Sequence, residues 1–597
     1  MAVFRNDQVQ FTFGVEAAQG GDPEMMEGTL VGSGGTGTLN GAHNAGSRSI
    51  VIARTGGTYV VGDFIRIGTN AAPPVMNVEV RRIEHMASAG DNTTNTFLLD
   101  RPTAFHHAAS VAVLEVSAVG GTDARNDKDK LITWIPGVFE SVDTPDPQMS
   151  FEGRRFLGTQ SKRNWALAYP GQQTLTGSVT GIVLLNGWPL RFPIGKITTI
   201  PQADTGSADL TADAQKGDMF ITMNSTSGYT AGAFICIYDF VTGESAGVLN
   251  NTKTAEVNRI DTVISGTVLR LTYPLQHKHL TDSLVKYNNS STYYDHEIVE
   301  TVELDTMSWN VHMLDSGETA ANAFNRRYMG GMVDSGTISA EEGGMVTMSW
   351  DGVQFLNMVH NQEDQATVAA NIYSSDSTGS GMPRYALNQA IDAEDVMMVK
   401  QTQAAANDTT GYPTTEPYYF SDGTIKFFDQ EFARIRSFSL SISNSIEPRY
   451  YIGKRGARQR GPYEIKEGAR EYTMSCSVAL PDTIAASATT ATGATELFKQ
   501  LLLEGDYGTA AGRIGMTASL KFERGSGLND YIIIDIPTSA TGTRGAPPAT
   551  TGQLNSQGIF ITTAPHPIGT DNPYQVDLDL MFRGIKIWIR DTEPLYP

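Results

Sequence analysis

The sequence predicts a mainly β protein in which two copies of one small β-module interrupt a larger β-rich core. Three observations predict it: a module that occurs twice, strands that alternate apolar and polar residues, and few helical patterns. Alternation with a period of two buries one face of a strand and leaves the other in water, as in antiparallel sheets. We therefore expect mainly antiparallel sheets and few helices.

The repeated module extends from about Leu39 to Val113 and again from about Leu210 to Val285. Both copies contain the string Tyr-x-x-Gly-x-Phe-Ile-x-Ile, beginning at Tyr59 and at Tyr229, and both end with Leu, Pro, His and Val in that order. The matching residues keep their order, but the number of residues between matching positions changes along the module, as insertions and deletions in surface loops would cause. Other matching pairs are Gly46 and Gly217, Ile50 and Ile221, Arg82 and Arg259, Glu84 and Asp261, and His107 and His279.

Strand patterns dominate the rest of the chain. Alternating segments occur at 346–350, 438–442, 472–480, 576–580 and 585–589. The best helical stripe is Thr495–Glu504, with Gly505 as a stop, and weaker ones lie at Gln362–Ile372 and Tyr385–Val399. The Ser/Gly-rich stretch Ser374–Pro383 indicates a linker.

Bulk composition excludes several classes of protein. A chain of 597 residues is too long for one core, and we expect three to five domains. With 44 Lys and Arg against 65 Asp and Glu, the formal charge of −21 argues against a general nucleic-acid binder. Two cysteines, Cys236 and Cys476, exclude a disulfide framework and are expected to be buried thiols. We see neither a secretory signal nor a membrane-spanning run, so we expect assembly in a reducing cytoplasm.

A fainter duplication lies outside the modules. The stretches from Gly158 to Ser178 and from Gly453 to Ser475 each carry a basic, turn-rich loop that leads into an alternating strand. An apolar segment follows each, Ile182–Leu190 and Leu497–Leu503, which could be a short helix or a hydrophobic plug.

These glycine and hydrophobic patterns resemble the tail tube proteins of long-tailed, siphovirus-like bacteriophages. The resemblance covers the chain outside the two modules, and its motifs are of moderate specificity. It rests on Phe13–Glu16 with Gly20, Phe156–Thr159, Gly171–Val179, Pro189-Leu190 with Gly195, Arg327–Gly331, Gly336–Ser339, Gly343-Gly344, Ser441–Asn444 and Ile465–Gly468.

The resemblance implies a β-sandwich-like or barrel-like core, duplicated within the chain, with a short flanking helix. Such subunits close into rings, which stack into a hollow tube. A duplicated tube domain implies trimeric rings that mimic six-fold symmetry, and a single one implies hexameric rings. The implied partners are further copies of the chain, a tape-measure protein, tail terminator and distal tail proteins, and double-stranded DNA passing through the lumen without specific binding. The implied place is the virion tail, after assembly in the host cytoplasm.

The expected domains alternate between core and insert. They are the start of the first tube domain (1–27), the first inserted β-domain (28–118), the first tube domain (119–204), the second inserted β-domain (205–290), the first tube domain continued (291–360), a linker or helical segment (361–415) and the second tube domain (416–597).

Basic residues cluster in the two duplicated loops of this acidic chain. They are Arg154, Arg155, Lys162, Arg163, Arg449, Lys454, Arg455, Arg458 and Arg460. Our hypothesis is that these loops reach the next ring and dock on acidic surface. The alternatives are solvated loops or, less readily, loops that contact DNA. The negative charge also suggests carboxylates that face the lumen and repel phosphates, although acidity equally favours solubility.

Patterns for catalysis and cofactors are weak. The Gly32–Gly37 string resembles a dinucleotide loop, but no helical pattern follows to hold a pyrophosphate. His296-Glu297 lacks the second histidine of a zinc protease, and His106-His107 and the pair His277 and His279 lack a third metal ligand. We expect His107 and His279 to be packed or hydrogen-bonded, and the Arg82/Arg259 and Glu84/Asp261 positions to be structural. The sequence predicts neither cofactor nor enzyme activity.

The function that the sequence predicts is that of the major tail tube protein, a conduit for genome ejection. Two alternatives remain open: another β-structural virion protein at the tail tip or on the capsid, and a β-protein that binds or cleaves carbohydrate.

Overall fold

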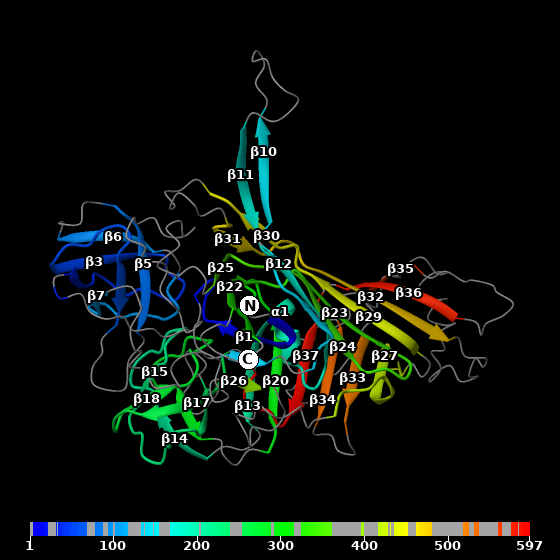
Figure 1. Ribbon diagram of the computed structural model, residues 1–597. Helices are drawn as coiled ribbons and strands as arrows, with labels where there is room; N and C mark the ends of the chain where they lie inside the picture. Colours follow the sequence, from blue (N-terminus) through cyan, green and yellow to red (C-terminus); the bar gives the residue numbers. More distant parts are fainter. Residues whose placement is uncertain are drawn as a thin grey trace, which may run out of the picture.

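The computed structural model describes residues 4–21, 32, 34–68, 78–87, 93–99, 102–116, 133–135, 138–146, 148–154, 167–201, 205–238, 254–287, 292–315, 324–360, 396–398, 416–427, 430–431, 435–451, 461–479, 518–524, 530–536, 559–563, 575–582 and 584–596. Strands dominate these residues and helices are short, which confirms the predicted mainly β class (Figure 1). No helix among them is long and apolar enough to cross a membrane.

An antiparallel eight-stranded sheet holds most of the alternating segments. Its order is β35 (Ile559–Thr563), β36 (Gln575–Phe582), β32 (Glu471–Ala479), β29 (Ile435–Ser443), β23 (Ser335–Glu341), β24 (Thr347–Gln354), β12 (Thr176–Val183) and β9 (Ser141–Asp143). One face is apolar and buried, as the alternation requires: Ile338, Leu440 and Met474 lie in one cross-strand row and are buried.

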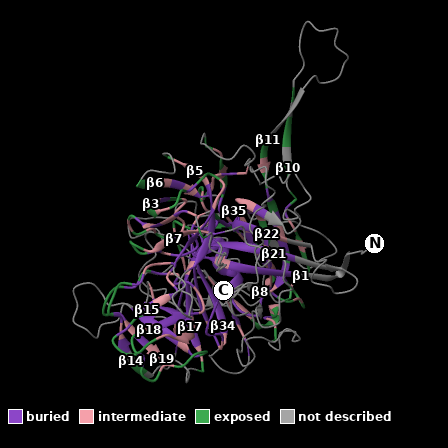
Figure 2. Ribbon diagram, turned by 60° about the vertical axis from the view of Figure 1, so that its left-hand side comes forward, coloured by how far each residue is buried: buried purple, intermediate pink, exposed green. Residues whose placement is uncertain are grey.

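A second sheet packs against this buried face. Its order is β13 (Gly195–Pro201), β20 (Tyr294–Glu300), β37 (Lys586–Asp591), β34 (Tyr531–Ile536), β33 (Ala518–Glu523), β27 (Gly423–Phe427) and β28 (Gln430–Glu431). Leu520, Ile534 and Ile587 from this sheet join the same core as the buried row of the first. The two sheets therefore form a sandwich. Figure 2 shows buried residues concentrated in the strands at the centre of the molecule.

A third sheet completes the core. It contains β25 (Asn357–His360), β22 (Phe324–Gly331), β21 (Thr306–Asp315), β1 (Phe4–Glu16), β8 (Thr133–Ile135) and β26 (Val396–Met398). Phe13 on β1 stacks on Trp188 with 4.9 Å between ring centroids, and Trp350 of β24 meets Trp188 edge-on at 5.5 Å. This aromatic cluster lies where the sheets meet.

The helical expectations have mixed outcomes. The apolar segment at Ile182–Leu190 ends in a 3-10 turn, η2 (Trp188–Leu190), followed by the short helix α1 (Arg191–Ile194). The helix expected at Tyr385–Val399 is wrong at its end, because Val396–Met398 pairs in parallel with β8 as a strand. The expected helix Thr495–Glu504, with the apolar Leu497–Leu503 inside it, and the one at Gln362–Ile372 lie outside the described residues. A further 3-10 turn, η7 (Phe420–Asp422), precedes β27.

The first copy of the repeated module is a closed barrel, and the second has the same connections. The first contains, in pairing order, β2 (Thr36–Leu39), β3 (Ser49–Gly56), β6 (Thr94–Leu99), β5 (Glu79–Met86), β4 (Phe64–Ile67) and β7 (Ala112–Val116). The second contains β14 (Thr205–Asp209), β19 (Leu284–Tyr287), β16 (Phe234–Tyr238), β17 (Glu256–Val263), β18 (Val268–Leu271) and β15 (Phe220–Thr222). A bridge between Leu210 and Met223 stands where β2 pairs with β3 in the first barrel.

Side-chain contacts also match between the two modules. The Tyr59 hydroxyl donates to the Val113 carbonyl (2.9 Å), and the Tyr229 hydroxyl donates to the Val285 carbonyl (2.6 Å). The Ala104 amide donates to Glu79, and the Gln276 amide donates to Glu256, both at 2.9 Å. Each of these hydrogen bonds joins two residues of the same module. The repeated sequence pattern therefore reflects a fold that the two modules share.

Both repeated histidines are buried, as expected, and the His107 ring is also hydrogen-bonded. His107 Nε2 lies 2.5 Å from Glu79 Oε1, and His279 Nε2 lies 3.8 Å from Glu256 Oε1. The repeated arginine and carboxylate positions are also structural, but in the first module the two residues have separate partners. Arg82 donates to the Gly62 carbonyl, and Glu84 lies 3.6 Å from Arg48.

Removing the Glu79 charge is expected to destabilise the first module. Burial alone would raise the pKa of Glu79, but Arg81 and the His107 hydrogen bond hold it below its ordinary value. The folded pKa is therefore lower than the unfolded one, so the stabilisation is complete above the unfolded pKa and is lost as the pH falls through the folded pKa. We expect Glu79→Gln to cost about 3 kcal/mol at neutral pH, because it removes the carboxylate that lies 2.5 Å from the buried Arg81 guanidinium.

The measurement is hydrogen exchange across residues 34–116 during urea unfolding, with Glu256→Gln as the matched change in the second module. The Glu79→Gln difference from wild type should shrink below about pH 4. Equal costs for the two substitutions, with no dependence on pH, would contradict this account.

Candidate functional site

The wet face of the eight-stranded sheet is covered by hydroxyl and carboxylate side chains. The register places Thr337, Ser441 and Thr473 in one row across three strands. The next rows contain Ser339, Ser439, Ser475 and Asp579, and Glu341, Ser437, Ser477 and Asp577. None of these rows, as far as the structure describes them, contains Lys or Arg. These rows are therefore mostly hydrophilic and negative, although the Thr337 row continues to Met581, which is 40% exposed, and they offer phosphate groups no cation.

The strands of this sheet follow a tandem order. Read from one edge, the first half is β9, β12, β24 and β23, and the second half is β29, β32, β36 and β35. Both halves have the same chain order. Two strands separated by an excursion come first, β9 and β12 in one half and β29 and β32 in the other. A pair of strands comes later in the chain, β23 and β24 or β35 and β36, and the first strand of each pair lies farthest from β9 or β29. The halves meet where β23 pairs with β29 over Ser335–Glu341.

The excursion in each half is a hairpin, and these two hairpins are the basic loops that the sequence singled out. One is formed by β10 (Gln148–Arg154) and β11 (Leu167–Thr174), and the other by β30 (Glu447–Arg449) and β31 (Glu464–Lys466). The Tyr450 hydroxyl donates to the Gln173 carbonyl at 3.1 Å, so the two stems touch. Figure 1 shows β30 and β31 at the base of the β10–β11 stem, and in Figure 2 this stem extends away with exposed residues.

The hairpins are strongly basic for such an acidic chain. Residues 148–174 contain four Lys or Arg and one Glu, a formal charge of +3, and residues 447–466 contain six Lys or Arg and two Glu, a charge of +4. Arg154 ends β10, and the exposed Arg449 ends β30 with its Nε 3.6 Å from Glu447. The other predicted stacking residues lie outside the described part: Arg155, Lys162, Arg163, Lys454, Arg455, Arg458 and Arg460.

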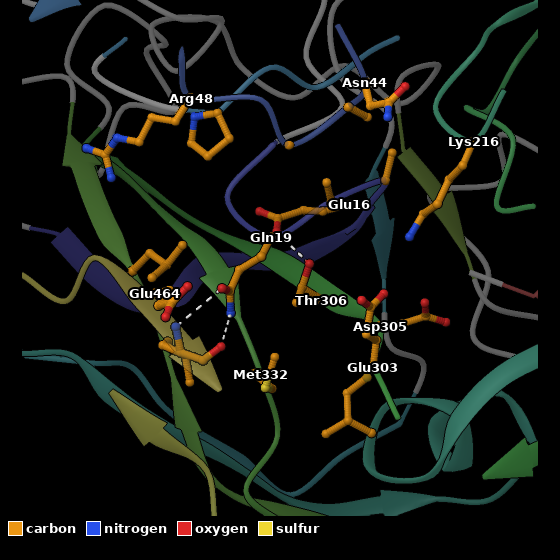
Figure 3. Close-up of a pocket in the computed structure, with 18 of the residues that line it drawn as sticks. Glu16, Gln19, Asn44, Arg48, Lys216, Glu303, Asp305, Thr306, Met332 and Glu464 are labelled. Atoms are coloured by element: carbon orange, nitrogen blue, oxygen red, sulfur yellow. Dashed lines mark hydrogen bonds between the residues drawn. The ribbon is translucent and has the colours of Figure 1, made fainter. Parts of the chain in front are cut away.

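A cavity of about 750 Å³ lies between the two modules and the core (Figure 3). The buried Glu16 carboxylate in its wall accepts hydrogen bonds from the Gly20 and Gly330 amides and the Thr306 hydroxyl, each at 2.9 Å. Asp305 is held by Arg191 at 2.6 Å. Both buried carboxylates thus have hydrogen-bond or ion-pair partners within the protein. The cavity lies where the first module, the second module and the core meet.

The modules and the core meet through matching turns. His106 of the first module lies 3.0 Å from Asp218 of the second, while Gln276 and His277, which match Ala104 and Phe105, bind Arg191 and the Ile197 carbonyl of the core. Arg48 in the first module lies over the Tyr463 ring of the β30–β31 segment. Both modules are therefore fixed to the core and to each other.

His296, from one of the weak catalytic patterns, lies inside the core. His296 is fully buried, lies 3.2 Å from Asp591 and stacks on Tyr596 with 3.9 Å between ring centroids. The described residues contain no group of three or more His, Cys, Asp or Glu that could hold a metal ion. The two cysteines are buried thiols, and burial raises the pKa of Cys476 to about 12, so it is protonated at neutral pH.

Comparison with known families identifies the chain's relatives. A family model described as phage tail tube protein matches residues 6–580. The chain belongs to the phage tail tube protein family. No curated protein matches the chain.

Membership confirms the resemblance noted in the sequence. The tail tube protein is a structural component of the virion tail and assembles with other tail proteins into a multimeric tube. The matched range includes both inserted modules, which the resemblance in sequence motifs does not cover. Sequence reasoning missed the Glu16 hub, although Glu16 ends the Phe13–Glu16 motif on which the resemblance partly rests.

Proposed function

We propose that three copies of this tail tube protein close into a ring through the eight-stranded sheet, and that rings stack into a conduit for the genome. The tandem order of the sheet carries this proposal. By position, β35 in the second half corresponds to β23 in the first, and β9 corresponds to β29. A junction between β35 of one copy and β9 of the next would therefore repeat the internal β23–β29 junction.

This junction would also remove two sheet edges. Exposed edges present unpaired amide and carbonyl groups and invite pairing with other chains. A head-to-tail contact that closes by rotation makes a ring. Two tandem halves in each of three copies give a ring of three-fold symmetry that imitates six-fold symmetry.

In this ring the wet face lines the lumen. The hydroxyl rows, with carboxylates such as Asp577 and Asp579, would let DNA pass without adhering strongly, since Lys and Arg supply most of the affinity of proteins for the phosphate backbone. Among the described residues, the second module contacts β13 and α1, so we expect the modules to project outward. The tube would form around a tape-measure protein, with terminator and distal tail proteins at its ends.

The test is negative-stain electron microscopy of the purified protein, alone and with its tape-measure partner. We expect rings with three-fold symmetry, or hollow striated tubes with lateral knobs formed by the modules. Discrete monomers that fail to polymerise even with the partner would contradict the proposal. Rings made of six chains would contradict the trimeric ring but would still agree with a tube of stacked rings.

A further inference from the structure

A compact surface lies at the end of the sandwich opposite the hairpins. The β23–β24 turn is its centre: the Phe420 amide donates to the Gly344 carbonyl (3.0 Å), and Met345 forms a bridge with Tyr419. The adjacent chain is joined by bonds from the Leu184 amide to the Val346 carbonyl and from the Val183 amide to the Val138 carbonyl. Segments from four parts of the sequence therefore meet at this end.

We call this surface the acidic rim and define it by its exposed members. They are Val138, Glu140, Glu341, Glu342, Met345, Tyr419, Asp422 and Arg436. Val138, Met345 and Tyr419 are 42%, 42% and 40% exposed, which is unusual for apolar side chains grouped at the end of a packed sandwich. Four carboxylates and one arginine, which lies 3.2 Å from Glu342, give the rim a net charge of −3.

The strands of the sheet run from the rim to the hairpins. β29 begins at Ile435, next to the rim, and ends at Ser443, from which the chain enters β30. β12 begins at Thr176, just after β11, and ends at Val183 beside Val138. Nine residues of extended strand span about 30 Å, so the basic and acidic ends are well separated within one subunit.

We propose that the acidic rim is the docking site for the basic hairpins of a second copy of this chain in the neighbouring ring. The inference rests on the proposed stacking of rings and names the surface that receives the hairpins. Translation of one subunit along its strands brings the hairpin end of one copy to the rim end of the next. Because the two surfaces differ, the contact is head-to-tail and can continue indefinitely, as a tube requires.

Charge and apolar surface both fit this occupant. The hairpins carry +3 and +4 against −3 on the rim, which favours encounter and fixes register. The hairpin stem also presents Phe151, which is 62% exposed, as an apolar counterpart to Met345 and Tyr419. A two-stranded hairpin is marginally stable by itself, so the β10–β11 stem gains order from a surface that covers it.

The test reverses charge on the rim without disturbing the ion pair between Arg436 and Glu342. Glu341→Lys with Asp422→Lys should leave ring formation intact and shorten or abolish tubes, seen by electron microscopy and by sedimentation. Both side chains are exposed, so thermal unfolding should match that of wild type. A chain that also carries Arg455→Glu and Arg458→Glu should recover tubes, whereas the hairpin change alone should lose them.

The control is Asp213→Lys, a reversal of a 41%-exposed carboxylate on the second module, which should keep tubes of normal length. Rim variants that make tubes like those of wild type would overturn the docking inference alone. A wild-type protein that makes neither rings nor tubes would overturn the proposed function, and the docking inference with it. The docking inference would also be overturned if a different tail protein restored tubes of the rim variant while the hairpin substitutions had no effect on tube formation.

Discussion

Replacing Trp350 by alanine is expected to prevent the sandwich from folding stably. The Trp350 side chain is fully buried on β24, and its indole nitrogen donates to the Pro189 carbonyl at 3.1 Å. Its ring lies 5.5 Å from Trp188 and 5.2 Å from Phe192, measured between centroids. Truncation removes the centre of the aromatic cluster and opens a cavity between the sheets, at a cost of about 3–5 kcal/mol. A loss of this size approaches the whole stability of many domains.

The measurement is the urea midpoint followed by far-ultraviolet circular dichroism, with the yield of soluble protein as a second readout. Tyr451→Ala is the matched control, because Tyr451 is 52% exposed on the second hairpin and its loss should cost less than about 1 kcal/mol. If Trp350→Ala unfolds at the wild-type midpoint, the cluster does not hold the sheets together.

The repeat was the feature that sequence could predict most fully. Gly46 and Gly217 have φ angles of 86° and 88°, a left-handed conformation that favours glycine, so the same turn selects the same residue in both copies. The alternating segments were equally visible, because β29 and β32 have one buried and one wet face. By contrast, β34 is buried at every position from Tyr531 to Ile536, so it has no alternation to distinguish it from a buried helix.

Sheet order was beyond reach of the sequence. β23 and β29 are neighbours although nearly a hundred residues separate them, and only packing of the whole core selects that pairing. The candidate sites divide in the same way. Basic loops are contiguous in sequence and were predicted, whereas the acidic rim gathers Val138, Glu341 and Tyr419 from distant segments and was not.

Placing lysines on the wet face is expected to stall DNA passage while leaving assembly intact. Thr337 and Thr473 face the same side in one row, separated by Ser441 on the strand between them. Thr337→Lys with Thr473→Lys would add cations to every ring of the tube, and each lysine can bind a phosphate and release counterions. Because the substitution recurs along the whole conduit, many weak contacts would act on one DNA molecule at once. We expect ejection to slow by roughly tenfold or more, since phosphate contacts raise DNA affinity steeply at moderate salt.

The matched variant is Thr337→Glu with Thr473→Glu, which changes the same positions with side chains that repel phosphate. Both variants should form tubes of wild-type length, because a wet face tolerates long polar side chains. Ejection is followed as release of DNA from purified virions after triggering, over a range of salt concentrations. The lysine variant should recover as salt rises, because screening weakens phosphate contacts, and the glutamate variant should not change. If the lysine variant ejects DNA at the wild-type rate in low salt, this face does not line the path of the genome, and the ring must close with the sheet turned the other way.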